Sequence, residues 1–304
     1  MNPFDAFKQF RRDRVIRRAY GTRDPQLVTL PQTGRTLRVN PADRRVRKVL
    51  LYDPLRGRTK TNQSWWQTAA AAFAPTLAID VGLNYGECLL GTDYPPGCRC
   101  HGFEANAALL PYLSESLAGH PQRESIRVHE AAVAAEAGLK LSFVIDQQWS
   151  GRSHLAAASD DRSAGVEART VTTTTLDASV PRPTASDRVL FKIDVEGFEP
   201  DVLAGGLSTL CGDAPSLGFV EFDPEVHEKR GFDVADYWGV LADRFRVYRC
   251  ARTGEATPIT AADWSAARGQ IASRHCDLIL EQGDSEFHRA ALDAWRASAV
   301  CRAA

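Results

Sequence analysis

The chain has 304 residues, of which 44% are hydrophobic and 25% are charged, and its formal net charge is −1 at pH 7. This composition is ordinary for a globular protein and ample for a sizeable core. No apolar run approaches the roughly 20 residues that span a bilayer, and the Arg-rich amino terminus lacks the apolar segment of a secretory signal. We therefore expect a cytoplasmic protein with one large domain, or one domain and an appendage.

The charge is unevenly distributed along the chain. Residues 1–60 hold 16 Lys and Arg against 5 Asp and Glu, so the remainder is acidic. Such asymmetry marks nucleic-acid or membrane contact in some proteins. We favour the simpler interpretation that a basic arm folds back onto an acidic body.

Seven cysteines are present, and no two of them form a Cys-x-x-Cys pair. Cys98 and Cys100 are separated by a single residue, which does not fit a zinc site. An odd count with this spacing indicates reduced, mostly buried thiols in a cytosolic protein.

The first 75 residues are predicted to form an extension. A polar helix is expected over residues 1–20, a hairpin over 27–41 and an Ala-rich helix over 61–73, which Pro75 ends. The rest of the chain, residues 76–304, is predicted to be a single second domain.

From residue 77 onward, short apolar strands alternate with helical segments. The predicted strands cover residues 77–81, 98–104, 126–133, 188–195 and 217–222, and the predicted helices cover 86–93, 106–118, 199–210 and 234–244. This alternation is typical of a parallel sheet with helices on both faces. We therefore predict an α/β fold built on a doubly wound, mostly parallel sheet.

Some segments depart from the alternation. Residues 139–146 and 168–177 are predicted to be extra strands, joined by a polar loop over 147–165 that we expect to be mobile. Residues 245–250 and 276–281 are expected to form an antiparallel pair at the carboxyl-terminal edge of the sheet. A helix is expected over the last 20 or so residues.

The first parallel strand runs into Asp80 and then a loop that contains Gly82, Asn84 and Gly86. Ligands of doubly wound sheets bind at the carboxyl ends of the strands. Glycine lets the main chain approach a ligand that a Cβ would push away. We therefore expect this loop to hold a cofactor.

Glu104 ends the next strand, where a carboxylate accepts hydrogen bonds from ribose hydroxyls. The loop and Glu104 together indicate an adenosine-type cofactor. The carboxylate of Asp80 would repel a pyrophosphate, but it suits the sulfonium and ammonium groups of S-adenosylmethionine. No GxxxxGK[ST] phosphate loop is present, so S-adenosylmethionine is the predicted cofactor.

Several motifs occur together in one order along the chain. They are IDVGLNYG, GFEAN (102–106), TLD (175–177), LFKIDVEGFEPDVLAGG (190–206) and VEFD (220–223). This series resembles the FkbM family of methyltransferases over about residues 77–223, with Leu83 where the family usually has Ala. The resemblance implies a class I, Rossmann-like fold and O-methylation of hydroxyls of sugars, polyketides and related secondary metabolites.

The resemblance also implies roles for single residues. It assigns Asp80, Gly82, Asn84 and Gly86 to the methionine side of the cofactor and Glu104 to its ribose. Residues 130–133, at the end of the third parallel strand, are expected beside the adenine from their position in the fold, with Ala131 or Ala132 offering a small surface, and we assign Ala132. The implied partner is a small-molecule or glycan acceptor with a free hydroxyl.

Methyl transfer to a hydroxyl requires in-line alignment and a group that takes the proton. The ends of the fourth and fifth parallel strands offer three carboxylates that we expect to be catalytic: Asp194, Glu196 and Glu221. One of them is expected to be the general base, with a pKa raised by its acidic neighbours.

Other interpretations of this acidic cluster remain open. Lys192 is expected to neutralise some of the charge, and a Mg²⁺-class cation between Asp194 and either Glu221 or Asp223 is an alternative to the metal-free site that we favour. Glu196 or Glu199 can instead bond the backbone N–H groups of the turn and cap the following helix.

Three other residues are weaker candidates. His154, in the polar loop, is a further possible base, although lone histidines in such loops are usually only exposed. Trp65 and Trp66 are expected to pack the Ala-rich helix over 61–73 onto the core rather than to stack on a sugar.

Three rival functions share some of these features. A nucleic-acid methyltransferase would use the basic arm to hold phosphates, but the acidic strand ends argue against it. A nicotinamide-dependent dehydrogenase is disfavoured by Asp80 and because the sequence lacks the catalytic Lys, His or Tyr constellation of such enzymes. A cofactor-binding protein without catalysis is the remaining alternative.

Overall fold

The computed structural model describes residues 3–156, 166–251, 255–271 and 275–303. Residues 157–165, which belong to the loop expected to be mobile, lie outside this set. None of the helices within these ranges is both long and apolar enough to cross a membrane.

The extension folds much as its sequence predicts. Its elements are α1 (Pro3–Tyr20), β1 (Leu27–Thr29), β2 (Thr36–Arg38), η1 (Val46–Tyr52), η2 (Pro54–Arg56) and α2 (Thr61–Phe73). The two short helices η1 and η2 were not predicted. They carry the chain from the hairpin back toward the centre of the molecule, where α2 begins.

The central sheet combines a parallel half with an antiparallel edge. Its described strands are β3 (Leu77–Val81), β4 (Arg99–Glu104), β5 (Ile126–Glu130), β10 (Val189–Ile193), β11 (Ser216–Phe222), β12 (Arg246–Cys250), β13 (Ala256–Ile259) and β14 (Cys276–Gln282). They lie in the order β13-β12-β14-β11-β10-β3-β4-β5. All neighbours from β11 to β5 are parallel, whereas β14 and β12 are antiparallel to their neighbours.

This order confirms the predicted α/β class and the antiparallel carboxyl-terminal edge. The chain grows from β3 toward β5, and then returns to β10 on the other side of β3. The carboxyl ends of β3 and β10 therefore form the switch point at which doubly wound sheets bind ligands.

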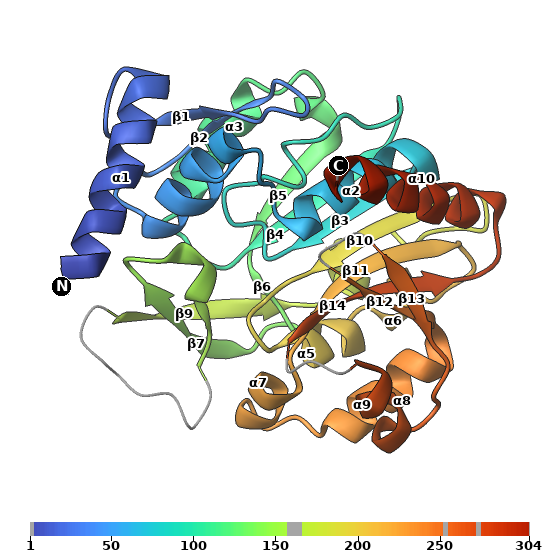
Figure 1. Cartoon of the computed structure of the whole chain (residues 1–304). Coiled ribbons are helices and arrows are strands. Elements are labelled where there is room, and N and C mark those ends of the chain that lie inside the picture. The colour runs from blue at the N-terminus through green and yellow to red at the C-terminus, as the bar shows by residue number, and fades with distance from the viewer. Residues whose placement is uncertain (1–2, 157–165, 252–254, 272–274, 304) are drawn as a thin grey trace.

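Helices cover both faces of the sheet (Figure 1). The remaining described helices are α3 (Leu110–Ala118), η3 (Arg123–Ser125), η4 (Ser150–Arg152), α4 (Leu176–Ser179), α5 (Glu199–Ala204), α6 (Leu207–Leu210), α7 (Pro224–Lys229), α8 (Val234–Arg244), α9 (Trp264–Ile271) and α10 (Glu286–Ala303). Helices α2 and α10 pack together, and α2 also contacts β10 and β11.

Side chains that alternate along each strand build two separate cores. On β3, Ala78 joins the cluster that contains Trp65, whereas Leu77 and Ile79 join the cluster that contains Trp238. This period of two is the pattern of a strand buried on both faces, which explains why these strands are readable as continuous apolar runs.

A second, smaller sheet lies near the carboxyl ends of the parallel strands (Figure 1). It consists of β6 (Ala132–Val133), β9 (Val166–Thr174), β7 (Lys140–Asp146) and β8 (His154–Leu155) in that order. The two predicted extra strands are therefore confirmed as β7 and β9. A small apolar cluster beneath this sheet brings Ala132, Phe143, Leu155 and Phe198 together.

Two helix predictions were wrong in detail. Residues 86–93 form turns rather than a helix, because the left-handed backbone of Asn84 (φ 52°) and Gly86 (φ 80°) does not lead into a right-handed helix. The helix predicted over 199–210 is divided into α5 and α6 at the Gly205–Gly206 pair.

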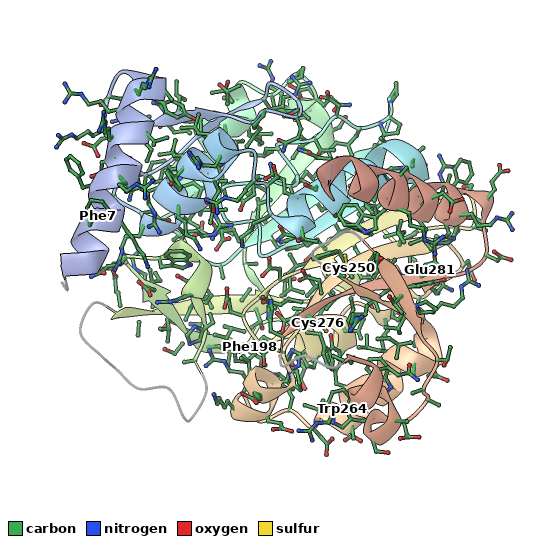
Figure 2. The ribbon with its side chains drawn as sticks, viewed as in Figure 1. Phe7, Phe198, Cys250, Trp264, Cys276 and Glu281 are labelled. Carbon is green, nitrogen blue, oxygen red and sulfur yellow. The ribbon has the colours of Figure 1, made fainter. Side chains whose placement is uncertain are left out.

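The basic arm folds onto the body, as expected. Three of its arginines form ion pairs with carboxylates beyond residue 75: Arg35 with Asp93, Arg38 with Glu115, and Arg45 with Glu87. Apolar residues of the arm, among them Ile16 and Leu50, belong to the same core cluster as Leu89 of the body. On α1, Phe7 is 58% exposed (Figure 2) and Phe10 is 60% exposed.

The cysteines that the structure describes are free thiols, as predicted. They are Cys88, Cys98, Cys100, Cys211, Cys250 and Cys276. All but Cys211 are buried.

Candidate functional site

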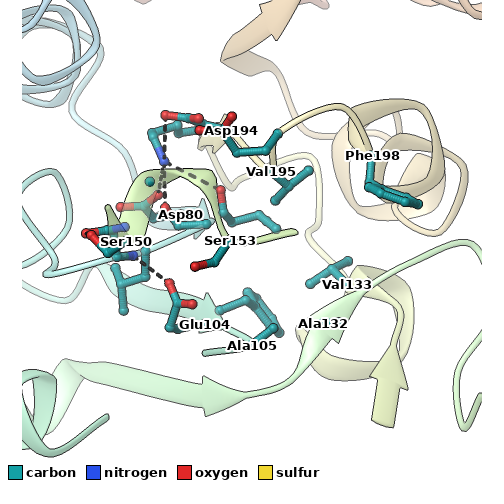
Figure 3. A pocket seen from close by; sticks show the side chains of 18 of the residues that line it. Asp80, Glu104, Ala105, Ala132, Val133, Ser150, Ser153, Asp194, Val195 and Phe198 are labelled. Carbon is teal, nitrogen blue, oxygen red and sulfur yellow. Dashed lines mark hydrogen bonds and ion pairs between the residues drawn. The ribbon is translucent and has the colours of Figure 1, made fainter. Parts of the chain in front are cut away.

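A pocket opens at the switch point of the sheet and encloses about 840 Å³, including solvent at its mouth. Its lining comes from the ends of β3, β4 and β10, from the second sheet and from the extension (Figure 3). Five of the six predicted cofactor-binding residues are in this lining: Asp80, Gly82, Asn84, Glu104 and Ala132. Gly86 is not.

Glu104 is held rigidly at the end of β4. One carboxylate oxygen accepts the backbone N–H of Asn84 at 2.7 Å, and the other accepts that of Asn106 at 2.8 Å. Only 7% of the residue is exposed. Burial raises the pKa of the Glu104 carboxyl to about 7, although the two backbone donors oppose this shift. Each oxygen keeps a further lone pair for a ligand hydroxyl.

The pocket wall beyond Glu104 is apolar. Ala132 lines it together with Phe103, Phe143, Leu155 and Phe198. These side chains come from both sheets and from the turn before α5. Such a surface suits a flat aromatic group such as a purine base.

The glycines of the loop have a different role from the one predicted. A Cβ on Gly82 would lie 1.9 Å from the carbonyl oxygen of Asp194, and a Cβ on Gly86 would meet the side chain of Leu90 at 2.8 Å. Both glycines have positive φ, 81° and 80° respectively. The expectation that a ligand occupies the space of these missing Cβ atoms was therefore wrong, because protein atoms already fill it.

Asn84 links three parts of the chain. Its side-chain oxygen accepts hydrogen bonds from Arg45 at 2.9 Å and from Ser150 at 3.1 Å. Arg45 belongs to the extension and also forms the buried ion pair with Glu87. The loop is thus held by the extension on one side and, on the other, by η4, which connects β7 and β8 of the second sheet.

Three lining residues from the extension were not predicted: Arg45, Lys60 and Asn62. The side chain of Asn62 donates to the Asp194 carboxylate at 3.2 Å. The positive charge of residues 1–60 was the sole sequence signal that could have suggested them, and it does not identify single residues.

Asp80 lies at the buried end of the pocket and is paired with Lys192. The Lys192 ammonium lies 2.9 Å from Asp80 and 3.7 Å from Asp194, as the expected neutralising role requires. Burial alone would lower the pKa of Lys192, but the two carboxylates raise it above its ordinary value. Because Asp80 is neutralised in this way, its charge is weaker evidence against a pyrophosphate than the sequence implied.

A second, wider groove adjoins the first pocket, and its space, including open solvent, is about 2070 Å³. The two cavities share Lys60, Asn62 and Asp194. One wall of the groove is the segment 57–62, and the other is formed by residues 249–251 and 275–277 at the ends of β12 and β14.

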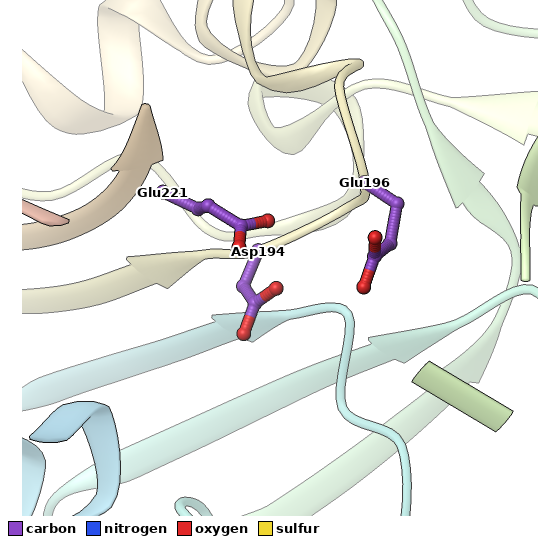
Figure 4. Close-up of side chains that lie close together, drawn as sticks. All are labelled: Asp194, Glu196 and Glu221. Atoms are coloured by element: carbon purple, nitrogen blue, oxygen red, sulfur yellow. The ribbon is translucent and has the colours of Figure 1, made fainter. Parts of the chain in front are cut away.

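The three predicted catalytic carboxylates meet where the two cavities join (Figure 4). One oxygen each from Asp194, Glu196 and Glu221 lies within 4.8 Å of the others. Asp194 lines both cavities, Glu196 the first and Glu221 the second. The structure therefore brings this predicted set together.

The three carboxyls have different proton affinities. Burial, followed by repulsion from Asp194 and Glu199, raises the pKa of Glu196 to about 8. Burial and the neighbouring Asp194 and Glu196 also raise the pKa of Glu221. Burial opposes the ionisation of Asp194, but Lys192 and Lys60 lower its pKa below the ordinary value. One carboxyl with a lowered pKa thus lies beside two carboxyls whose pKa values are raised.

Two other acidic residues of this region are occupied by the backbone. Glu199 accepts hydrogen bonds from the N–H groups of Val195 and Gly197, which is one of the alternatives weighed above. Asp223 caps the amino terminus of α7 through the N–H groups of residues 225 and 226.

The weaker candidates lie away from both cavities. His154 is outside the two linings, and its ring contacts the backbone carbonyl of Arg152. Trp65 and Trp66 are buried in the core. Trp66 donates to the hydroxyl of Tyr94 at 2.8 Å, so the expected packing role is confirmed.

A comparison with solved structures finds several methyltransferases that are similar to this chain at low sequence identity. The FkbM methyltransferase of Methylobacillus flagellatus KT is 14% identical over 68% of this chain, with a TM-score of 0.39, and the match spans 44% of that protein's length. The O-methyltransferase TomG of Streptomyces achromogenes, solved with S-adenosylmethionine, is 12% identical over 74% of this chain and 82% of its own, with a TM-score of 0.39. No curated protein sequence matches the chain significantly.

The model of the methyltransferase FkbM domain matches residues 80–250. This range covers more than half of the chain, from Asp80 to the end of β12, and it contains both the glycine loop and the carboxylate cluster. The protein therefore belongs to the FkbM family of methyltransferases.

Proposed function

We propose that the protein is an S-adenosylmethionine-dependent O-methyltransferase that acts on a hydroxyl of a sugar, a polyketide or a related polar metabolite. One observation carries this proposal: a pocket suited to an adenosine opens directly onto a cluster of three carboxylates and a second, wider groove. That arrangement provides a place for the methyl donor, the proton acceptor and the substrate in two adjoining cavities that share Lys60, Asn62 and Asp194.

The lining suggests how the cofactor lies. Its adenine would rest on the apolar wall around Ala132, and its ribose would bond Glu104. The methionine end would then extend past Gly82 and Asp80 toward the extension, where Lys60 carries a positive charge that suits a carboxylate, whereas Arg45 is already paired with Glu87. In this orientation the sulfonium faces Asp194 and the mouth of the groove.

The acceptor would occupy the groove. Its walls are mostly polar and carry both charges: the cations include Lys60 and Arg249, and the acids include Asp277. Such walls favour a polar acceptor rich in hydroxyls over an apolar one.

Each of the three carboxylates has its own role in the proposed reaction. The acceptor hydroxyl must lose a proton as its oxygen attacks the methyl group in line with the departing sulfur. Glu196, with a pKa near 8, is the best placed general base in the first pocket. Asp194, which stays ionised, would orient the hydroxyl, and Glu221 would hold the acceptor from the groove side.

A cation-assisted mechanism is the main alternative at this site. Three carboxylate oxygens within 4.8 Å of one another are compatible with a divalent cation of the Mg²⁺ class. We favour the metal-free base, because Lys192 and Asn62 already satisfy Asp194 and because raised pKa values leave the cluster with less negative charge to attract an ion.

Chelation separates the two mechanisms. Formation of S-adenosylhomocysteine would be followed with a panel of sugar and polyketide acceptors, with and without EDTA. The carboxylate-base proposal predicts equal rates in both conditions. Loss of activity in EDTA, with recovery on addition of Mg²⁺ or Mn²⁺, would overturn the base mechanism while leaving methyl transfer in place.

The other two functions remain separable by experiment. Retention on heparin or RNA that falls steeply with salt would support a nucleic-acid substrate held by the basic arm, although several arginines of that arm are engaged with the body. Tight binding of S-adenosylmethionine without turnover on any acceptor would support a cofactor-binding protein.

A further inference from the structure

The turn after β10 holds its backbone in an unusual conformation. Glu196 has a φ of 57° and Gly197 a φ of 103°. A positive φ is uncommon for glutamate, because its Cβ then crowds the backbone, and such residues persist only where the surrounding structure fixes them. The direction of the Glu196 side chain depends on this conformation.

Glu199 fixes the turn from within. Its Oε1 accepts the N–H of Val195 at 2.8 Å and the N–H of Gly197 at 3.3 Å, which are the amides on either side of Glu196. Glu199 is 1% exposed, and it lines neither cavity. It therefore acts on the site through the backbone and not through a ligand.

His227 in turn fixes Glu199. Its Nε2 lies 2.9 Å from the second oxygen, Oε2, of Glu199, and the residue is fully buried. The rings of Phe222 and Tyr237 pack edge-on against the imidazole, at centroid distances of 5.4 and 5.2 Å. These contacts leave the imidazole little freedom to rotate away from the carboxylate.

The helix that carries His227 also presses on the turn itself. A Cβ on Gly197 would lie 2.5 Å from the side chain of Val226, so α7 and the turn are in direct contact. His227 Nδ1 has no hydrogen-bond partner among the residues described. Because the Glu199 carboxylate can only accept, Nε2 carries the proton that lies between the two side chains.

We propose that Glu199 and His227 form a buried positioning pair that holds the Glu196 carboxylate at the junction of the two cavities. The catalytic meaning of this pair rests on the proposed function, but the coupling from His227 to the turn does not. The negative charge of Glu199 also contributes, after burial and Asp194, to the raised pKa of Glu196, whereas Lys60 and Arg45 oppose it.

Amide hydrogen exchange of Val195 and Gly197, resolved by NMR, tests the coupling without any acceptor. His227→Phe keeps an aromatic ring between Phe222 and Tyr237 but removes the donor, so both amides should exchange about tenfold faster or more, the scale of one lost buried hydrogen bond. His227→Gln places an amide N–H near the position of Nε2 and should restore slow exchange.

His288 provides a matched control. It is also buried, at 1% exposure, and its Nε2 contacts the carbonyl of Ser216 at 2.8 Å, far from the turn in sequence and fold. His288→Phe should leave the exchange of the turn amides unchanged. Equal acceleration in both Phe variants, or none in His227→Phe, would overturn the proposed coupling.

A second readout detects positioning rather than folding. The side-chain carboxyl of Glu196, assigned by its loss in Glu196→Gln, would be titrated by carbon-13 NMR in the wild type and in Glu199→Gln. The amide oxygen of the variant keeps the bonds to the turn, and its NH2 group can donate to His227 Nε2 once the ring proton is on Nδ1. The variant removes the charge, so the midpoint should move below the wild-type value near pH 8. An unchanged midpoint would contradict the pairing. If both tests succeed but Glu196→Gln transfers methyl groups at the wild-type rate, the pair stands and the proposed catalytic role of Glu196 fails.

Discussion

The buried Glu104 carboxyl makes the stability of the folded protein depend on pH. Its pKa is raised from 4.5 to about 7 by burial, so the folded protein holds this proton more tightly than the unfolded chain does. The resulting stability is fully present below pH 4.5 and is lost as the pH rises through about 7.

We expect this linkage to appear in the unfolding free energy of the cofactor-free protein. Between about pH 5 and pH 8, the wild type should lose up to about 3 kcal/mol relative to Glu104→Gln, which has no proton to release. Urea unfolding of both proteins across this range measures the difference, in which the other titrating groups largely cancel. Parallel stability curves would show that Glu104 titrates normally.

Gly82 offers a test of the close approach between the backbone of the glycine loop and the backbone of Asp194. Its missing Cβ would lie 1.9 Å from the Asp194 carbonyl, whereas Gly138, which also has a positive φ of 84°, has nothing within 4 Å of the same position. Gly138→Ala should therefore cost only about 1–2 kcal/mol for its backbone conformation, and Gly82→Ala should cost about 1–3 kcal/mol more because of the clash. Thermal unfolding measures both, and equal losses would contradict this close approach.

The carboxylate cluster predicts a pH profile of activity. If Glu196 is the general base, it must be ionised to react, so turnover should rise with pH through about 8. Glu196→Gln should reduce turnover by about 100- to 10,000-fold and abolish this rise. Asp194→Asn should also reduce turnover but keep the rise. Near-wild-type rates in both variants would exclude both carboxylates as the general base and leave the alignment of acceptor and cofactor as the source of catalysis.

At the level of elements, the segment 57–62 lines the acceptor groove and contributes two residues to the cofactor pocket. Lys60 lines both cavities, and the proposed orientation places it at the carboxylate of the cofactor's methionine. Lys60→Met should therefore weaken S-adenosylmethionine, by about 1–3 kcal/mol as for a hydrogen bond between charged groups, but not methylthioadenosine, which lacks the amino-acid part.

Calorimetric titration of the two ligands into each variant measures this difference. Lys48→Met is the matched control, because Lys48 lies over the ring of Trp149, 5.9 Å from its centroid, and lines neither cavity. The same loss for both ligands, or a loss in the control, would contradict the assigned orientation.

The strands were predictable from sequence because each is a short apolar run whose burial needs no knowledge of its partner. The same reasoning failed at residues 86–93, where the positive φ angles of Asn84 and Gly86 prevent a helix. It also failed to divide 199–210 into α5 and α6 at Gly205–Gly206. Local pattern therefore predicted the parallel strands, although residues 126–133, expected as one strand, form β5 and β6 in two different sheets. The positive φ angles of Asn84 and Gly86 account for one helix error, and the break at Gly205–Gly206 accounts for the other.

The candidate site was predictable to a similar degree. Asp194, Glu196 and Glu221 follow two strands whose carboxyl ends must meet, so topology brings them together. Arg45, Lys60 and Asn62 reach the site only because the extension wraps back over the sheet. No local pattern in residues 1–75 specifies that long-range packing.

For the whole molecule, the extension is expected to be part of the folded unit and of the site. Deleting residues 1–60 would uncover the apolar surface that Ile16, Leu30 and Leu50 bury, and it would remove Arg45 and Lys60 from the pocket. The truncated protein should therefore melt at a lower temperature, bind an apolar dye and lose affinity for S-adenosylmethionine. An unchanged melting temperature would show that the arm is an independent appendage.

The central claim is that the pocket at the switch point binds S-adenosylmethionine through Glu104. Isothermal titration of S-adenosylmethionine into the wild type and into Glu104→Gln, beside a titration of NAD into the wild type, tests it most directly. We predict saturable binding to the wild type, affinity weaker by about 1–3 kcal/mol in the variant, and no binding of NAD. Tight NAD binding, or equal affinity of both proteins for S-adenosylmethionine, would contradict the claim.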